Sequence, residues 1–236
     1  EKNRVGGVMT IVSQRWAGVI AEVWYEQSGL GLLQSLDICT ARGNITIFNT
    51  YWPYKNLHGD TSLWQRTVRF LQRNQHLPQD PAEYLRLLID RRSLKARERS
   101  GLVLIGGDFN AEWASSQTTR GCHSPGFQRW TREMEWTNET HAKVLRTGGS
   151  PHTYFKGLQA RSFIDHILVA TRLIHQDMAP TRVLEADVED ETHDTLLSDH
   201  RLLWAAVEVP FSTQMVPKQL SRVYRSLTEK GETPYA

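Results

Sequence analysis

The chain contains few cysteines and no long apolar run. Only Cys39 and Cys122 are present among 236 residues, and no CxxC pair occurs. This argues against a disulfide framework and a structural zinc site, because both need several cysteines at close spacing. The longest apolar runs, 102–105 and 202–207, have the length of a strand and are too short to span a membrane. We expect an intracellular protein, nuclear or cytoplasmic, without membrane contact.

An excess of charge of one sign is also absent. Lys and Arg total 28 against 26 Asp and Glu, which gives a net charge of +2. A nucleic-acid partner would therefore have to be recognised by local groups rather than by a basic surface. The hydrophobic fraction of 39% and the 8 Trp exclude a disordered chain. The chain begins at Glu1 without a Met or a signal peptide, so we expect a piece of a longer protein.

Strand and helix patterns alternate along the sequence. Short apolar or β-branched runs predict strands, and the Gly-Asn pair at 43–44 predicts a hairpin between two of them. Helices are predicted after Asp60, after the Asp80-Pro81 pair and after Ser124-Pro125. The predicted strands are 7–13, 32–40, 44–51, 102–105, 153–155, 163–170, 181–188 and 201–209. This mixture indicates an α+β or layered α/β domain.

Several cations gather at the end of the second predicted helix, in residues 91–99 with the sequence RRSLKARER. Cations near a helix C-terminus interact favourably with the partial negative charge of the last carbonyl groups. A solvated basic helix end is the simpler interpretation. Contact with DNA through the same residues is the alternative.

The first segment whose side chains could take part in a reaction follows the predicted strand at 102–105. Gly106 and Gly107 allow the backbone to turn sharply, and Asp108 and Asn110 come next. Residues two apart in an extended segment face the same way, so a carboxylate and an amide would share one site. A carboxylate can accept a proton or orient water, while an amide can position a phosphate oxygen or the nucleophile.

Two further segments place an acid beside a histidine. Asp165 and His166 lie inside an otherwise apolar strand, and Asp199 and His200 open the next one. Burying an unpaired carboxylate is costly, so Asp165 needs a partner. If that partner is His200, the carboxylate fixes the tautomer of the ring and raises its basicity. We expect His166 only to flank the site.

The order of these motifs resembles that of a known superfamily. Gly-Asp-Phe-Asn, Ile-Asp-His-Ile and Ser-Asp-His-Arg-Leu, in this order, are similar to the endonuclease/exonuclease/phosphatase superfamily of metal-dependent phosphoesterases. The stretch 47–53, with Tyr51-Trp52-Pro53, and the stretch 150–154, with Thr153, extend the resemblance over roughly residues 5–209. Within the superfamily, the pattern is most similar to the endonuclease domain of LINE-type (non-LTR) retrotransposons.

The resemblance implies a four-layer α/β/β/α sandwich of two mixed sheets in residues 1–209, with residues 210–236 as a polar linker or tail. It also implies Mg²⁺, or alternatively Mn²⁺, as the cofactor, and DNA as the partner of a monomer whose parent polypeptide could carry a reverse transcriptase. The implied residues are Asp108, Asn110, Asp165, His200 and Tyr51 for catalysis, Asp199 for the metal, and Thr153, Asn110 and Tyr51 for substrate binding.

The sequence departs from the family pattern at its start. The family's first strand carries an Asn, and a metal-binding Glu follows it, both upstream of the segment that begins here at Gly6. We therefore expect an exposed apolar patch or an unpaired sheet edge near residues 8–12, and weak or no nicking by this chain alone. Two alternatives to a DNA endonuclease stay open: an inactive remnant with at most weak nucleic-acid binding, and a phosphatase acting on a small phosphoester.

Overall fold

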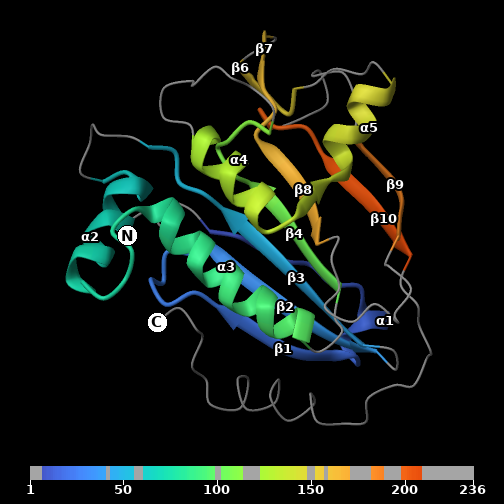
Figure 1. The fold of residues 1–236 in the computed structure, drawn as a ribbon, viewed down its shortest axis with the longest axis horizontal. Helices are drawn as coiled ribbons and strands as arrows, with labels where there is room; N and C mark the ends of the chain where they lie inside the picture. The colour runs from blue at the N-terminus through green and yellow to red at the C-terminus, as the bar shows by residue number, and fades with distance from the viewer. Residues whose placement is uncertain are drawn as a thin grey trace.

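The centre of the structure is a six-stranded mixed sheet (Figure 1). The computed structural model describes residues 7–40, 43–55, 61–98, 102–113, 123–147, 152–156, 159–170, 182–188 and 198–208. The strands, in their spatial order, are β1 (Ile20–Tyr25), β2 (Leu33–Thr40), β3 (Gly43–Tyr51), β4 (Leu102–Asp108), β8 (Asp165–Ala170) and β5 (Trp136–Asn138). β3 and β4 pair in parallel and the other neighbours are antiparallel. The predicted hairpin is present as β2 and β3, but its predicted turn pair is wrong, because Gly43 and Asn44 pair with Thr40 and Cys39 within the ladder; residues 41–42 lie outside the described residues.

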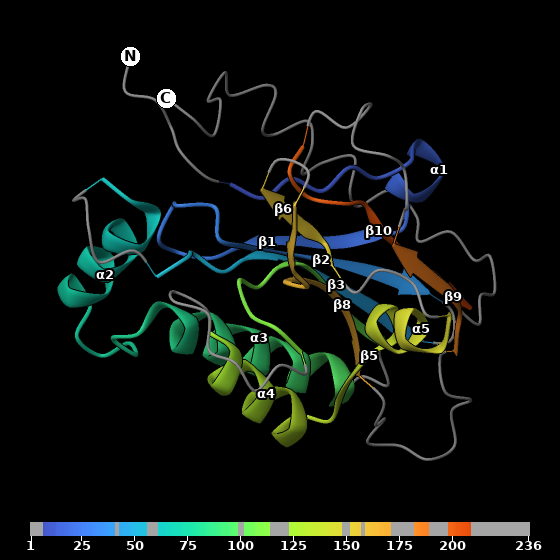
Figure 2. The same cartoon turned by 90° about the horizontal axis from the view of Figure 1, so that it is seen from above.

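Helices cover one face of this sheet (Figure 2). They are α2 (Leu63–Arg73), α3 (Pro81–Glu98) and α4 (Ser124–Glu133). The predicted start of α3 is confirmed, because the Asp80 carboxylate accepts the backbone N–H groups of Ala82 and Glu83. The N-cap of α2 is Ser62, which accepts the N–H of Gln65, while Asp60 lies outside the described residues. The main hydrophobic core lies between these helices and the sheet.

A smaller sheet packs on the opposite face (Figure 2). It consists of β9 (Arg182–Val188) and β10 (Leu203–Glu208), which are antiparallel. The remaining elements are α1 (Gln14–Ala17), α5 (Glu139–Thr147), and a hairpin of β6 (Tyr154–Lys156) and β7 (Gln159–Ser162). Val207 of β10 contacts the second hydrophobic cluster on the large sheet, and α5 packs against β9. The predicted mixed α/β class is confirmed.

The predicted strand at 7–13 is wrong. The backbone amide of Val8 donates to the carbonyl of Gly31, and the Asn49 side chain donates to the carbonyl of Met9 at 2.8 Å. Residues 7–13 therefore lie against the side chains of the sheet instead of joining its hydrogen-bond ladder. An apolar, β-branched run has the composition of a strand, but a tertiary contact decides its pairing.

Apolar side chains of this segment face solvent. Met9 is 75% exposed and Ile11 is 82% exposed. The expected exposed apolar patch near residues 8–12 is thus present. β1 is an edge strand of the large sheet and, in the described part of the chain, pairs only with β2.

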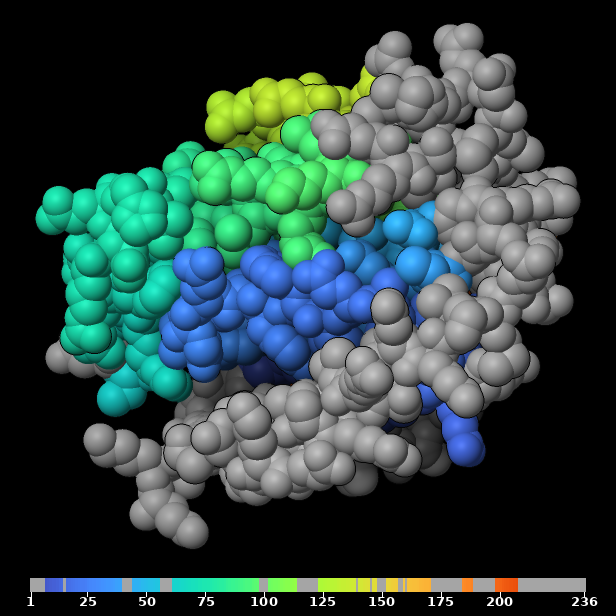
Figure 3. Space-filling view, turned by 90° about the horizontal axis from the view of Figure 1, so that it is seen from below, coloured from blue at the N-terminus to red at the C-terminus, as the bar shows by residue number. Residues whose placement is uncertain are grey.

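The basic end of α3 is partly folded into the protein. Arg92 lies 3.2 Å from the carboxylates of both Glu22 and Asp37, and Arg97 is 7% exposed and donates to the carbonyl of Met134. Figure 3 shows the surface of the N-terminal residues (blue) adjoining that of α3 (green). The interpretation as a solvated helix end is therefore wrong for these two arginines, because their acceptors come from distant segments.

No helix among the described residues is long and apolar enough to cross a membrane.

The parallel strands β3 and β4 leave no room for a side chain at Gly107. Its φ angle of +148° lies in a region that favours glycine, and a Cβ added there would meet the carbonyl oxygen of Thr50 at 1.9 Å. Its neighbour Gly106 has open space around the corresponding position. The pairing of the two strands at their carboxyl ends therefore depends on Gly107.

Gly107→Ala should lower the free energy of unfolding by at least about 3 kcal/mol, because the backbone must separate to admit the methyl group. Gly106→Ala is the matched control and should change it by less than about 1 kcal/mol. Urea unfolding followed by circular dichroism measures both. Equal unfolding midpoints for the two variants would contradict the proposed role of the close approach.

Candidate active site

The site begins where three strands meet. Tyr51, the last residue of β3, is paired in register with Asp108, the last residue of β4. Asp108 is also opposite Asp165, the first residue of the antiparallel strand β8. The backbone amide of Trp52 donates to the carbonyl of Asp108 at 2.8 Å. The pairing of the strands therefore brings the Tyr51 phenol and the carboxylates of Asp108 and Asp165 together at one end of these inner strands.

The loop after β4 holds Asp108 and Asn110 together. Asn110 has a φ of +45°, a left-handed conformation that asparagine tolerates better than most residues. Its backbone amide donates to Asp108 Oδ1 at 2.8 Å, and its Nδ2 donates to the carbonyl of Trp52 at 2.8 Å. Both functional side chains are thus fixed by the turn that follows the strand.

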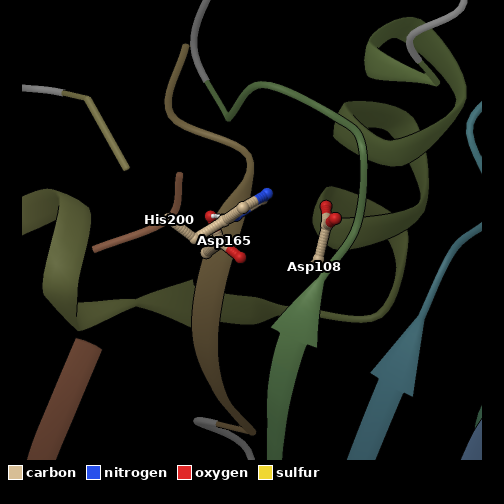
Figure 4. A group of neighbouring side chains, drawn as sticks. All are labelled: Asp108, Asp165 and His200. Atoms are coloured by element: carbon tan, nitrogen blue, oxygen red, sulfur yellow. Dashed lines mark hydrogen bonds and ion pairs between the residues drawn. The ribbon is translucent and has the colours of Figure 1, made fainter. Parts of the chain in front are cut away.

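Asp165 and His200 form a hydrogen-bonded pair opposite Asp108 (Figure 4). His200 Nδ1 lies 2.8 Å from Asp165 Oδ2. Because a carboxylate oxygen accepts, Nδ1 carries the proton, and Nε2 is left for a ligand or substrate. The partner that the sequence analysis expected for Asp165 is therefore present in the structure.

Burial and mutual charge perturb the three ionisable groups. Burial, followed by the nearby charge of Asp165, raises the pKa of Asp108 to about 7. The hydrogen bond to Asp165 raises the pKa of His200 above its usual value. Burial and the charge of Asp108 raise the pKa of Tyr51, which therefore stays a neutral phenol. At neutral pH, the site combines a carboxyl group near its midpoint with a readily protonated imidazole.

The same residues fit a divalent cation. One ligand atom each from Asp108, Asp165 and His200 lie within 4.8 Å of one another. Two carboxylate oxygens are typical ligands of hard cations such as Mg²⁺, and a positive ion would offset the repulsion between the acids. These residues of the described chain therefore form a candidate cation site.

Asp199 and Thr153 lie at the border of this group. The side chain of Asp199 is 65% exposed, and its Oδ1 lies 4.0 Å from Nε2 of His200, outside the three-residue group. Thr153 is fully buried, and its Oγ1 accepts the backbone N–H groups of Ile164 and Asp165, each at 3.1 Å. The structure thus places Asp199 at the rim of the site and Thr153 beneath it.

A buried histidine supports the loop after β4 from inside. His166 is fully buried, with its Nε2 at 2.7 Å from the carbonyl of Ala111 and its Nδ1 at 2.8 Å from Asn138 Nδ2. Burial lowers its pKa to about 3, so the ring is neutral, donates to Ala111 and accepts from Asn138. The sequence analysis missed this contact, since nothing near Asn138 connects it to a residue 28 positions away.

The comparison with protein families shows to which family the chain belongs. Residues 7–200 match the model of the Endonuclease/Exonuclease/phosphatase family. The chain belongs to this family. The prediction made from the three motifs is confirmed, and the family's hydrolysis of phosphoester bonds, generally with a divalent metal, agrees with the acidic group described above.

The chain is also similar to several solved structures over about three quarters of its length. A family protein from Leptotrichia buccalis matches at 14% identity and a TM-score of 0.39, covering 75% of this chain and 53% of its own. The human Nocturnin catalytic domain matches at 14% identity and a TM-score of 0.40, and the match covers 74% of this chain and 50% of that domain. The endonuclease domain of TRAS1, a telomere-specific non-LTR retrotransposon, matches at 16% identity and a TM-score of 0.38, and the match covers 77% of this chain and 64% of that domain. The chain thus spans about half to two thirds of these structures. No curated protein matches it.

Asp108→Asn should stabilise the metal-free protein at neutral pH. The folded state holds a proton on Asp108 up to about pH 7, whereas the unfolded chain releases it near pH 4, so this group's contribution to stability is lost as the pH rises between these values. Melting temperatures in EDTA should therefore differ little at pH 4 and favour the variant by a few degrees at pH 8.

The exposed carboxylate Glu83 offers the control for this measurement. Glu83→Gln should show no growing advantage over the same pH range. A difference between Asp108→Asn and the unmodified protein that stays constant from pH 4 to pH 8 would show that Asp108 titrates as an ordinary carboxyl group.

Proposed function

We propose that this protein hydrolyses phosphodiester bonds with the help of a divalent cation and that it nicks DNA, as an endonuclease domain of the retrotransposon type. The observation that carries the proposal is the hydrogen-bonded pair of Asp165 and His200 opposite Asp108, whose pKa is raised to about 7. Membership of the Endonuclease/Exonuclease/phosphatase family supports the reaction class. The DNA substrate is supported by the motif resemblance set out in the sequence analysis.

His200 and Asp165 act as a unit in this reaction. Asp165 accepts the hydrogen bond from Nδ1–H of His200 and so holds the imidazole in one tautomer and one orientation. The raised pKa of His200 favours the protonated ring, so Nε2–H can donate to a phosphoryl oxygen as negative charge develops there. Removing the carboxylate would lose both the orientation and the charge.

Asp108 serves as the group that orients or deprotonates the attacking water. A base works best when its pKa lies near the working pH, and Asp108 is held near that value by burial and by Asp165. Asn110 Nδ2 donates to the carbonyl of Trp52 at 2.8 Å and to Asp108 Oδ2 at 3.4 Å, so its side chain holds the Asp108 carboxylate in place for the attacking water. Tyr51 presents a neutral hydroxyl to the same phosphate.

A cation at this site would be held by the carboxylates of Asp108 and Asp165, with Asp199 at the rim, while His200 stays protonated as the donor to the phosphoryl oxygen. When bound, Mg²⁺ supplies positive charge to the phosphoryl oxygens and stabilises the ionised nucleophile. Mn²⁺ prefers similar oxygen ligands and is the alternative. The cation would also keep Asp108 ionised below the pH at which the metal-free carboxyl group titrates.

Two other functions are compatible with the same side chains. A phosphatase would use the pair and the carboxylate on a small phosphoester, and an inactive remnant would keep the fold without turnover. The substrate separates them. The test incubates the protein with supercoiled plasmid, an inositol phosphate or a nucleotide, each with Mg²⁺ or Mn²⁺. An endonuclease would nick the plasmid, a phosphatase would release inorganic phosphate from one of the small substrates, and an inactive remnant would give no product.

Asp108→Ala and His200→Ala should each lower the weak plasmid nicking that we expect of this chain by at least about 100-fold, because each removes a group that acts directly on water or phosphate. The conversion of supercoiled to open-circular plasmid with Mg²⁺ measures the rate, and EDTA should abolish it. Metal-dependent nicking that both variants retain would refute the proposed roles.

Arg91→Ala is the matched control for this experiment. Arg91 is exposed on α3, outside the acidic group, and should be dispensable. A loss of nicking in this variant would instead support DNA contact through the end of α3. If the chain turns over none of the three substrates with either metal, the inactive alternative is favoured.

A further inference from the structure

Thr153 is buried beneath the proposed catalytic pair and is fully engaged with the backbone. It has no exposed surface, and its hydroxyl oxygen accepts the N–H groups of Ile164 and Asp165, each at 3.1 Å. These are the last residue before β8 and the first residue of that strand, which carries the carboxylate of the pair. The hydroxyl therefore fixes the backbone at the point from which the Asp165 side chain projects.

The backbone of the same segment is bonded on both sides of His200. The carbonyl of Thr153 accepts the N–H of Arg201 at 2.8 Å, and the N–H of Phe155 donates to the carbonyl of Asp199 at 2.8 Å. Between these two bonds, Tyr154 forms an isolated bridge with His200. His200 is therefore fixed by the residues directly before and after it.

Tyr154 adds a side-chain contact to this backbone clamp. Its ring centroid lies 5.1 Å from that of His200, with an angle of 50° between the planes. Packing against an aromatic ring restricts the rotation of the imidazole. The segment 153–155 thus limits both the position of the His200 backbone and the orientation of its ring.

Thr153 is therefore hydrogen-bonded to Asp165 and to Arg201, which directly follows His200, and so links the two sides of a pair that is separated by 35 residues in the sequence. The Asp165–His200 distance of 2.8 Å joins β8 of the large sheet to the segment that precedes β10 of the small sheet. A displacement of about 1 Å is enough to break such a bond and can cost about 100-fold in rate. A residue that ties both backbones to itself can prevent that displacement.

We propose that Thr153 is a positioning residue that holds Asp165 and His200 at hydrogen-bonding distance, rather than a group that contacts the substrate. This inference rests on the proposed function. Its hydroxyl satisfies two backbone donors that would otherwise be buried without a partner, and a side chain lacking that oxygen lets the start of β8 move. A contact with the phosphate would instead require the hydroxyl to be exposed in the site.

The test compares Thr153→Val, which has nearly the same shape without the acceptor, with Thr153→Ser, which keeps it. The first readout is the nuclear magnetic resonance signal of the His200 Nδ1 proton, identified by its absence in His200→Asn. Thr153→Val should lose this signal through faster exchange with water, and Thr153→Ser should retain it. A signal that persists in Thr153→Val, or is lost in Thr153→Ser, would overturn the proposal.

The second readout separates positioning from substrate contact, using a fluorescein-labelled DNA duplex with Mg²⁺. Thr153→Val should lower kcat by about 10-fold to 100-fold with little change in KM, and Thr153→Ser should restore kcat to within about 3-fold. A raised KM with unchanged kcat would mean that Thr153 contacts the DNA. Because the proton signal is recorded without turnover, an inactive chain would refute the proposed function and leave the positioning test intact.

Thr67→Val is the matched control, since Thr67 is also fully buried but donates to a carbonyl within α2. It should leave the His200 signal unchanged. If Thr153→Val does not fold, hydrogen exchange of the unmodified protein decides the matter. The amides of Ile164 and Asp165 should be protected in it, and rapid exchange of both would overturn the proposal.

Discussion

The parallel pairing of β3 with β4 determines where the chemistry of this protein lies. In that register, Tyr51 is beside Asp108, and the close approach of the strands is made possible by Gly107. The antiparallel partner β8 then brings Asp165 opposite Asp108. A slip of one residue would turn these side chains to the other face, because successive residues of a strand alternate. The site thus depends on the ladder before it depends on any contact between side chains.

Two carboxylates at one sheet edge repel each other, and the surrounding groups offset this repulsion only in part. The hydrogen bond from His200 compensates Asp165, whereas the raised pKa of Asp108 shows that its negative charge is poorly solvated. Active sites commonly retain such unfavourable charges, since a better-solvated carboxylate would be a weaker base at neutral pH. A bound cation would convert the same arrangement into a favourable one.

Neutral polar groups below the site keep the charged ones in place. His166 links Ala111 to Asn138, and the side-chain Oδ1 of Asn138 in turn accepts hydrogen bonds from Thr140 and His141 at the start of α5. Every polar atom of this buried histidine is satisfied, so the network costs little and resists displacement. Together with the hydroxyl and the backbone carbonyl of Thr153, it connects the loop after β4, the start of β8 and the segment before β10 into one rigid support.

Local signals determined much of the fold and of the site. The hairpin of β2 and β3 was predictable from its two β-branched runs, although Gly43 and Asn44 belong to a strand, and the cap at Asp80 was predictable because cap chemistry acts over a few residues. The three motifs likewise predicted that Asp108 belongs to the site and that Asp165 pairs with His200. The segment 7–13 was predicted wrongly, and β1, β5 and α5 were missed, since short or exposed elements carry weak periodicity. Only the tertiary structure decided the raised pKa of Asp108, the burial of Thr153 and the contact between His166 and Ala111. These depend on which distant segments exclude water from a group and offer it a partner, and hydrophobic periodicity contains no information about either.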